Sequence, residues 1–188
     1  LGLKSESRIG KKAYLSPGSA FAGGTLARDA VFLRDLSNKF QLDTPLIASI
    51  IDSNRSHNNW VENKITQCFD TLKDLKVCIW GLTYKPGTNT LRRSKSIELC
   101  YWLLEHQASI RVYDPLIREI KDRSLEEVKV FDSATESFEG SDVLIIGTDH
   151  SEFLNQKDYL ISQIREKDFK IIDPNRFLGF EQIGVDYF

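Results

Sequence analysis

The sequence predicts an α/β protein in which a helical segment precedes a domain built on a parallel sheet. Up to about residue 73, apolar residues recur mostly at three- and four-residue steps, which is typical of helices. After residue 74, short runs rich in β-branched residues alternate with helical patterns, an order typical of parallel strands joined by crossover helices. We therefore predict a helical segment at 1–73 and a sheet domain at 74–188.

Two helix patterns fill the first segment. The first occupies residues 29–40, and the second runs from Ile47 to Leu72. Thr44 and Pro45 predict the start of the second, since a threonine hydroxyl can cap a helix and proline is tolerated at its first position. The polar run DSNRSHNNW at 52–60 interrupts the second pattern. We interpret it as a dimer interface or the rim of a binding site, with a solvated helix face as the alternative.

Five short apolar runs predict the strands of the sheet domain. Helical patterns at 94–107 and 151–167 lie between them. Residues 143–146 are continuously apolar, which is typical of a strand buried on both faces. The five runs are VCIWGL at 77–82, SIRVYD at 109–114, VKVF at 128–131, DVLIIGT at 142–148 and FKIID at 169–173.

Composition argues against several classes of protein. A formal net charge of −2 gives no electrostatic basis for binding nucleic acid or an anionic membrane. No apolar run approaches the roughly 18 residues that span a bilayer. The three cysteines lie in apolar segments, which favours buried, reduced thiols in a cytoplasmic protein. Neither they nor the three histidines have metal-ligand spacing, so we expect no metal, nucleic-acid or membrane partner.

The loop after the first strand, GLTYKPGTNTLRRS at 81–94, is a candidate binding loop. Ligands of parallel sheets bind beyond the carboxyl ends of the strands. This loop is basic and runs into a helix start at Ser94, a combination that favours phosphate, although a solvated basic loop is the alternative. It lacks the G-x-G-x-x-G pattern of dinucleotide sites. Asp114 ends the second strand, and we interpret it as an Asp-Pro turn rather than a ribose-binding acid.

A second candidate loop, SPGSAFAGGTLARDA at 16–30, is rich in glycine and small residues and opens directly onto a helix. Such a loop can bring its backbone close to a ligand. The simple interpretation of Thr25 is a helix cap, and that of Asp29 is a first-turn charge favourable to the helix dipole.

Three ordered segments resemble the UDP-glucose/GDP-mannose dehydrogenase family. RIGKKAYLSPGSAFAGGTLARD at 8–29 is similar to its R-I-G segment followed by P-G-x-x-F-G-G-S-C-x-x-K-D. GLTYKPGTNTLRRS at 81–94 resembles G-L-x-[YF]-K-x-x-T-x-D-x-R-x-S. GSDVLIIGTDHSEF and IIDPNRFL, at 140–153 and 171–178, resemble the late A-D-x-x-x-x-x-T-x-x-x-E-F and D-G-R motifs. Together the matches cover nearly the whole chain.

The resemblance implies a central helical segment that forms a homodimer, followed by a Rossmann-like domain that binds a nucleotide sugar. Family members also carry an N-terminal NAD-binding domain, whose glycine fingerprint is absent here. Because the chain starts at Leu1 and contains no methionine, we expect it to be a piece of a longer protein, with the front of its helical segment incomplete. The implied reaction is NAD-dependent oxidation of a sugar C6 alcohol to the acid through a cysteine-bound thioester.

The resemblance also assigns roles to single residues. Thr25 occupies the place of the nucleophilic cysteine, and Asp29 that of an aspartate that supports water and proton handling. Arg92 matches an arginine that reaches the NAD phosphates, with Thr25 and Arg28 also on the cofactor side. The implied substrate-binding residues are Arg8, which reaches across the dimer, Leu15, Ser16, Gly18, Phe21, Ala22 and Gly23 around the sugar, and Tyr84 and Lys85 at the nucleotide sugar.

Several positions depart from the family pattern. Besides Thr25, the residues Asn89 and Thr90 stand where an acidic residue is usual, and Arg93 replaces a glutamate. The closing motif reads DPNR at 173–176, so a substrate arginine is displaced by one position or lost. We hypothesise part of an NAD-dependent nucleotide-sugar 6-dehydrogenase with altered chemistry. A catalytically silent nucleotide-sugar-binding or regulatory homologue is the alternative, an engineered nucleophile variant is a third, and the choice between UDP- and GDP-linked sugars stays open.

Overall fold

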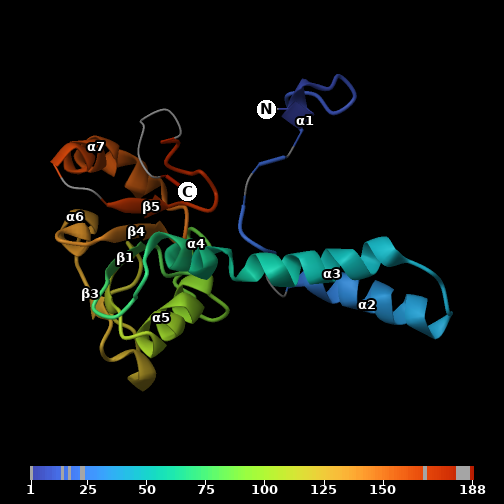
Figure 1. Ribbon diagram of the computed structural model, residues 1–188, viewed down its shortest axis with the longest axis horizontal. Helices are drawn as coiled ribbons and strands as arrows, with labels where there is room; N and C mark the ends of the chain where they lie inside the picture. The colour runs from blue at the N-terminus through green and yellow to red at the C-terminus, as the bar shows by residue number, and fades with distance from the viewer. Residues whose placement is uncertain (1, 14, 17, 22–23, 167–168, 181–186) are drawn as a thin grey trace.

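The computed structural model describes residues 2–13, 15–16, 18–21, 24–166, 169–180 and 187–188. It consists of a sheet covered by helices, from which two helices project as an arm, and a short N-terminal segment that lies apart from the sheet (Figure 1). The helical and sheet parts follow each other along the chain in the order that the sequence predicts.

Five parallel strands form the sheet: β1 (Lys76–Trp80), β2 (Ser109–Tyr113), β3 (Lys129–Val130), β4 (Val143–Ile146) and β5 (Lys170–Ile172). They lie in the order β3-β2-β1-β4-β5. In the middle of the sheet, Ile79 of β1 is opposite Val112 of β2 and Ile145 of β4. All five predicted strand runs are confirmed, and β4 is buried on both faces as its apolar sequence predicts.

Helices cover both faces of the sheet. On one face α4 (Trp60–Cys68) and α5 (Lys95–Glu105) pack with η1 (Arg123–Leu125) over the side chains of Val77 and Ile79. On the other face α6 (Ala134–Phe138), η2 (Ser151–Gln156) and α7 (Lys157–Glu166) enclose a second core around Trp80 and Phe153. The side chains of successive β1 residues thus pack into two separate cores, because strand side chains alternate between the two faces of a sheet. This two-sided cover explains why β4 is apolar throughout and why β1 is apolar from Val77 to Trp80.

The arm is a hairpin of α2 (Thr25–Lys39) and α3 (Pro45–Asn58), preceded by the short α1 (Gly2–Ser5). Pro45 is the first residue of α3, as predicted, but the predicted cap is wrong: the Thr44 side chain makes no capping hydrogen bond. The predicted helix is interrupted within the polar run at 52–60: α3 ends at Asn58, and α4 begins at Trp60.

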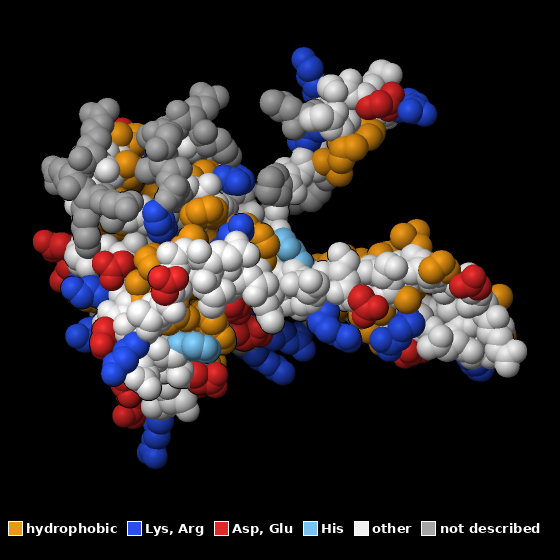
Figure 2. Space-filling view, in the orientation of Figure 1, with side chains coloured by type: hydrophobic (Ala, Val, Ile, Leu, Met, Phe, Trp, Pro, Cys, Tyr) orange, Lys and Arg blue, Asp and Glu red, His pale blue; other side chains and the backbone are white. Residues whose placement is uncertain are grey.

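The arm buries few of its own side chains. In α2 only Ala30 and Ser37 are buried, and in α3 none is. Phe32 is 63% exposed, and apolar side chains lie along the arm in the space-filling view (Figure 2). The other large apolar residues exposed on the hairpin are Leu26, Val31, Leu33, Leu36, Phe40, Leu42, Leu46 and Ile50. Burying such side chains is favourable by about 1.5–3 kcal/mol each, so the arm presents a surface suited to contact with another protein surface.

Within the described ranges, no helix is long and apolar enough to cross a membrane.

Candidate functional site

The strand order places the site. The chain leaves β1 toward one side of the sheet and β4 toward the other, so the loops after these strands diverge and leave a crevice. Gly81 and Gly147 follow the two strands, and the close approach of their loops requires both glycines. A Cβ on Gly147 would lie 2.5 Å from the Gly81 carbonyl oxygen, and one on Gly81, whose φ is +90°, would lie 2.5 Å from the Thr148 nitrogen.

Asp114 fixes the loop that follows β1. Its buried carboxylate accepts hydrogen bonds from the backbone nitrogens of Leu82 (2.7 Å) and Thr83 (3.1 Å). His150 Nε2 lies 3.2 Å from the same oxygen and 3.1 Å from the Thr83 hydroxyl. The other carboxylate oxygen accepts from the Leu116 nitrogen, so the predicted turn is present. Sequence reasoning missed the larger role: Asp114 occupies the backbone amides that would otherwise be available to a phosphate.

The loop at 81–94 presents Tyr84 and Lys85 at the carboxyl edge of the sheet. The Thr148 hydroxyl donates to the Thr83 carbonyl, and the Tyr84 nitrogen donates to the Thr90 carbonyl, so the loop is closed at its base. Ser94 caps α5 by accepting from the Ile97 nitrogen, as predicted. A cleft of about 600 Å³, including open solvent, lies beside the loop. Its lining comprises Ser19, Ala20, Thr83, Tyr84, Lys85, Pro86, Arg93, Lys95, Gly147, Thr148, Asp149 and Asn175, and we call it the Lys85 cleft.

Residues 18–21 cross to this edge and form what we call the strap. Asn175 Oδ1 accepts from the Ser19 nitrogen at 3.1 Å. On the other side, His57 Nε2 lies 2.9 Å from the Gly18 carbonyl oxygen, and Asn54 bonds both backbone groups of Phe21. The polar run at 52–60 thus holds the candidate loop; this contact agrees with its interpretation as the rim of a site.

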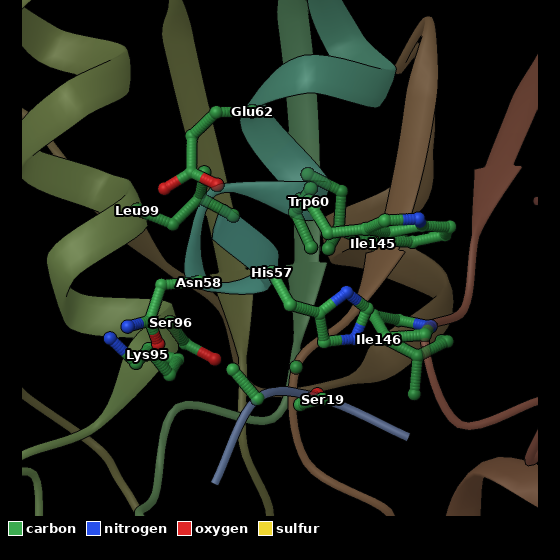
Figure 3. A pocket seen from close by; sticks show the side chains of 14 residues that line it. Ser19, His57, Asn58, Trp60, Glu62, Lys95, Ser96, Leu99, Ile145 and Ile146 are labelled. Atoms are coloured by element: carbon green, nitrogen blue, oxygen red, sulfur yellow. The ribbon is translucent and has the colours of Figure 1, made fainter. Parts of the chain in front are cut away.

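A second hollow opens beneath the strap, and the sequence analysis did not predict it. Figure 3 shows Glu62, Trp60, His57 and Lys95 around it, over a floor that includes Leu99 and Ile145. It spans about 560 Å³ with its open solvent and shares Ser19, Ala20, Lys95 and Gly147 with the Lys85 cleft. Burial raises the pKa of Glu62. The only sequence signal was the polarity of residues 52–60, because the remaining lining residues are separated along the chain.

Asn175 stands where the closing motif departs from the family pattern. Its amide donates to Asp149 Oδ2 at 2.9 Å while its oxygen binds the strap. Arg176 donates to the Tyr187 carbonyl and lies over the Tyr187 ring, 4.8 Å from its centroid. The side chain of Arg176 is therefore engaged with Tyr187, and of residues 173–176 only Asn175 lines the Lys85 cleft.

Several predicted site residues lie elsewhere. Arg8 is exposed in the N-terminal segment, where it pairs with Glu6 at 3.0 Å. Leu15 and Ser16 are exposed, and neither lines the Lys85 cleft. Gly18 and Phe21 belong to the strap, and Phe21 also lines a broad hollow along α3. Ala22 and Gly23 lie outside the described residues.

Thr25 is the first residue of α2 and is exposed. The cap interpretation is wrong, because Gly24 occupies the N-cap position and no side chain caps the helix. Asp29 lies beyond the first turn, so its predicted first-turn position is also wrong. It is exposed and lies 3.5 Å from Arg28. Each histidine is bonded elsewhere: His57 to Gly18, His106 to Trp102, and His150 to Thr83 and Asp114.

The residues implied for NAD do not form one site. Arg92 lines a hollow beside α5 and η1 with Tyr101, Lys121 and Asp122, whereas Thr25 and Arg28 lie at the start of the arm. The loop after β1 has no dinucleotide fingerprint, and two of its amides bind Asp114. The described residues therefore do not fit a dinucleotide at the switch point of this sheet.

Two of the three cysteines offer no substitute for a nucleophile at position 25. Cys78 and Cys100 are buried, as predicted, and burial raises the pKa of each thiol to about 12. Cys68 is half-buried near the end of α4. A thiol with so high a pKa supplies almost no thiolate at neutral pH. Across the described ranges, no group of three or more histidine, cysteine and acidic residues is arranged to hold a metal.

Residues 78–179 match the UDP binding domain of the UDP-glucose/GDP-mannose dehydrogenase family. This range covers more than half of the chain and contains both the loop at 81–94 and Asn175. The chain belongs to this family.

Relatives of this dehydrogenase-family chain extend the likeness to its whole length. It is 33% identical to the UDP-glucose 6-dehydrogenase of Rickettsia typhi over 195 residues, covering 100% of this chain and 44% of that protein. The structure of a UDP-glucose dehydrogenase from Pyrobaculum islandicum matches 99% of this chain and 40% of its own, with a TM-score of 0.74 and 18% identity. GDP-mannose dehydrogenase from Pseudomonas aeruginosa matches 94% of this chain and 41% of its own, with a TM-score of 0.68 and 23% identity. The chain thus spans less than half of these relatives.

The environment of Asp149 generates a pH prediction for this family member. Burial raises the pKa of Asp149, nearby Asp173 raises it further, and one of its carboxylate oxygens is buried without a hydrogen-bond partner. We expect Asp149→Asn to raise the melting temperature at pH 7, by about 2–4 °C if the gain is about 1 kcal/mol.

The folded state binds a proton at Asp149 more readily than the unfolded state does. The unmodified protein therefore gains stability as the pH falls through the raised pKa. The advantage of the variant should shrink as the pH falls from 7 to about 4 in thermal unfolding experiments. Asp132→Asn, at an exposed position, is the control. An advantage that stays constant across this range would contradict the account.

Proposed function

We propose that the chain is the nucleotide-sugar-binding and dimerisation part of a nucleotide-sugar 6-dehydrogenase, with its helical segment at 1–73 and its binding domain at 74–188. The observation that carries the proposal is the Lys85 cleft. There the loop after β1, the strap and the loop after β5 meet at the carboxyl edge of a parallel sheet in a member of this family.

The chemistry of the cleft suits a phosphorylated sugar. Lys85 is exposed at its rim and supplies a charge that can bind a phosphate oxygen. Tyr84, Ser19 and Thr148 add hydroxyl groups to the lining, and Asn175 adds an amide that already positions the strap. Because the amides of Leu82 and Thr83 are bonded to Asp114, recognition depends on these side chains and on the strap.

The cofactor we propose for the whole protein is NAD, and this part of the proposal rests on the family alone. NAD accepts a hydride when a sugar alcohol is oxidised. Since the described residues do not fit a dinucleotide at the switch point, we assign no step of this transfer to them. Arg28 and Arg92 are exposed cations that could contact a phosphate presented by another part of the protein. The two thiols buried in the sheet cores suit a reducing, cytoplasmic compartment.

Thr25 alters the chemistry that we propose. Oxidation of an aldehyde to an acid through a thioester needs a thiolate, and a threonine hydroxyl has no comparable anion at neutral pH. The three histidines are bonded elsewhere, and the thiols of Cys78 and Cys100 are buried with raised pKa values. We therefore propose that the protein binds the nucleotide sugar but does not complete its conversion to the acid. The same observation favours a catalytically silent binding or regulatory homologue as the second candidate.

We further propose that the arm forms a homodimer. The two helices bury almost none of their own side chains, and Phe32, Phe40 and Leu46 are each at least 60% exposed. A large contiguous apolar surface of this kind marks a site of contact with another protein. A second copy would cover this surface with the same apolar residues, as a two-fold interface does. Arg8, which is free of the sheet, would then be able to reach the site of the partner subunit.

Lys85→Ala should weaken the binding of UDP-glucose by about 1–3 kcal/mol, the contribution of a hydrogen bond to a charged group. Isothermal titration calorimetry of the intact protein measures this directly. Lys129→Ala removes the same charge from the exposed edge strand and should leave the affinity unchanged. Equal affinities for the Lys85 variant and the unmodified protein would refute the assignment, and parallel titrations with GDP-mannose test the base preference.

Thr25→Cys should raise the formation of the sugar acid by the intact protein, because it restores a nucleophile that can form a thioester. The unmodified protein should produce at most the aldehyde from UDP-glucose and NAD. Acid and aldehyde are separated by chromatography, and Thr25→Ser serves as the control that keeps a hydroxyl. Efficient acid formation by the unmodified protein would contradict our account of Thr25.

Phe32→Asp should raise the dimer dissociation constant by roughly tenfold or more, since burying one phenylalanine contributes about 1.5–3 kcal/mol. Sedimentation equilibrium of the intact protein measures the change. Lys73→Ala shifts the net charge by the same amount at an exposed position outside the arm and should leave the assembly intact. A clean monomer at micromolar concentration for the unmodified protein would contradict the dimer.

A further inference from the structure

The strap takes its shape from side chains rather than from secondary structure. Among the described residues, no backbone-to-backbone hydrogen bond holds residues 18–21. The backbone of Gly18, Ser19 and Phe21 is bonded instead by three side chains: His57, Asn175 and Asn54. These side chains come from opposite sides of the strap, since His57 and Asn54 belong to α3 and Asn175 follows β5.

Asn54 is matched to Phe21 in a specific way. Its Oδ1 accepts from the Phe21 nitrogen at 2.9 Å, and its Nδ2 donates to the Phe21 carbonyl oxygen at 3.1 Å. One amide side chain thus satisfies both backbone groups of a single residue, as the opposite residue of an antiparallel strand would. The side-chain amide of asparagine or glutamine carries its donor and its acceptor on two separate atoms, as a peptide group does, and the longer glutamine would shift the strap.

The strap forms part of the wall of three hollows at this edge. Ser19 and Ala20 line the Lys85 cleft, the hollow beneath the strap, and the broad hollow along α3. A shift of the strap would therefore change the shape of the Lys85 cleft without altering Lys85 itself. Positioning of this kind has large effects, because recognition depends on geometry as well as on the groups present.

We propose that Asn54 is a positioning residue for ligand binding, which acts by fixing the strap against α3 while Asn175 fixes it against the sheet. This inference rests on the proposed function, since it assumes that a nucleoside diphosphate sugar occupies the Lys85 cleft. It assigns a role to the polar run at 52–60. We call the Asn54 and His57 side chains of α3 the clamp, because their hydrogen bonds hold the strap that forms part of the wall of the Lys85 cleft.

The test uses the intact protein with Asn54→Ala, Asn54→Asp and the control Asn38→Ala, which makes the same change at an exposed site of α2. UDP-glucose affinity is measured by calorimetry, and exchange of the Phe21 amide hydrogen is measured in the absence of ligand. Asn54→Ala should accelerate Phe21 exchange and weaken UDP-glucose binding by about tenfold, the effect of two lost hydrogen bonds of modest strength. Because residue 54 is half-buried and its side-chain hydrogen bonds go to Phe21 of the strap, global unfolding should be little changed. Residue 54 does not line the Lys85 cleft, so a weaker affinity would not come from a lost contact with a ligand in that cleft.

Asn54→Asp separates positioning from general stability. It has nearly the shape of asparagine and keeps the acceptor for the Phe21 nitrogen, but it loses the donor and sets a negative charge against the Phe21 carbonyl. We expect Phe21 exchange to stay slow while UDP-glucose binding weakens to an intermediate degree. Asn38→Ala should change neither quantity.

The outcomes distinguish this inference from the proposed function. If the unmodified protein binds UDP-glucose and Asn54→Ala binds it equally well while Phe21 exchanges faster, the positioning role is wrong and the proposed function stands. If Phe21 exchange is unchanged in Asn54→Ala, the clamp itself is wrong. If the unmodified protein binds neither UDP nor UDP-glucose, the proposed function fails, and the positioning role fails with it.

Discussion

The buried carboxylate of Asp114 is the interaction on which the rest of the site depends. It is fully buried, and it accepts hydrogen bonds from the backbone of the loop after β1 and lies within hydrogen-bond distance of His150 in the loop after β4. A buried carboxylate is tolerated only when its oxygens are well bonded, and here backbone and imidazole groups provide that bonding. The two diverging loops are thereby tied together at the crevice, so that Tyr84 and Lys85 project from a fixed base.

A second constraint joins the arm to the sheet. Asn54 and His57 reach from α3 to the strap, and Asn175 reaches to it from the far edge of the sheet. The strap lies between α3 and the carboxyl ends of the strands, and Ser19 and Ala20 line both the Lys85 cleft and the hollow beneath the strap. The polar side chains of Asn54, His57 and Asn175 thus shape a binding surface, while the large apolar side chains of the arm are exposed. Site and arm are therefore mechanically linked through a few hydrogen bonds.

The residues that we propose for binding lie apart from those that we propose for the chemistry. The groups suited to a phosphorylated sugar gather at the Lys85 cleft, whereas Thr25 and Asp29 lie exposed at the start of the arm and do not line that cleft. A fold can retain a binding surface after its reactive group has changed, because the two depend on different residues. The family relationship therefore supports binding more strongly than it supports the complete oxidation. In the function that we propose, Thr25 is the position at which binding and oxidation diverge.

The elements with local causes could be predicted from the order of the residues alone. The β-branched runs predict the five strands, Ser94 predicts the start of α5, and the apolar run at 143–146 predicts a doubly buried strand. These features depend on neighbours within a few residues. The composition and position of two loops predicted candidate binding loops, and the ordered motifs indicated the family. Predictions from single capping residues were less secure, since neither Thr44 nor Thr25 caps its helix.

Which distant side chains meet became apparent from the folded chain and not from the sequence. The bond between Ser19 and Asn175 joins residues 156 apart, and that between Phe21 and Asn54 joins residues 33 apart. Nothing in the local pattern around Asp114 indicated that its carboxylate would face the loop after β1 rather than serve only a turn. Such contacts arise where the crossover topology brings the ends of separate strands to one edge. The packing of the whole chain determines which residues form these long-range hydrogen bonds. The spacing of the residues along the sequence therefore does not predict them.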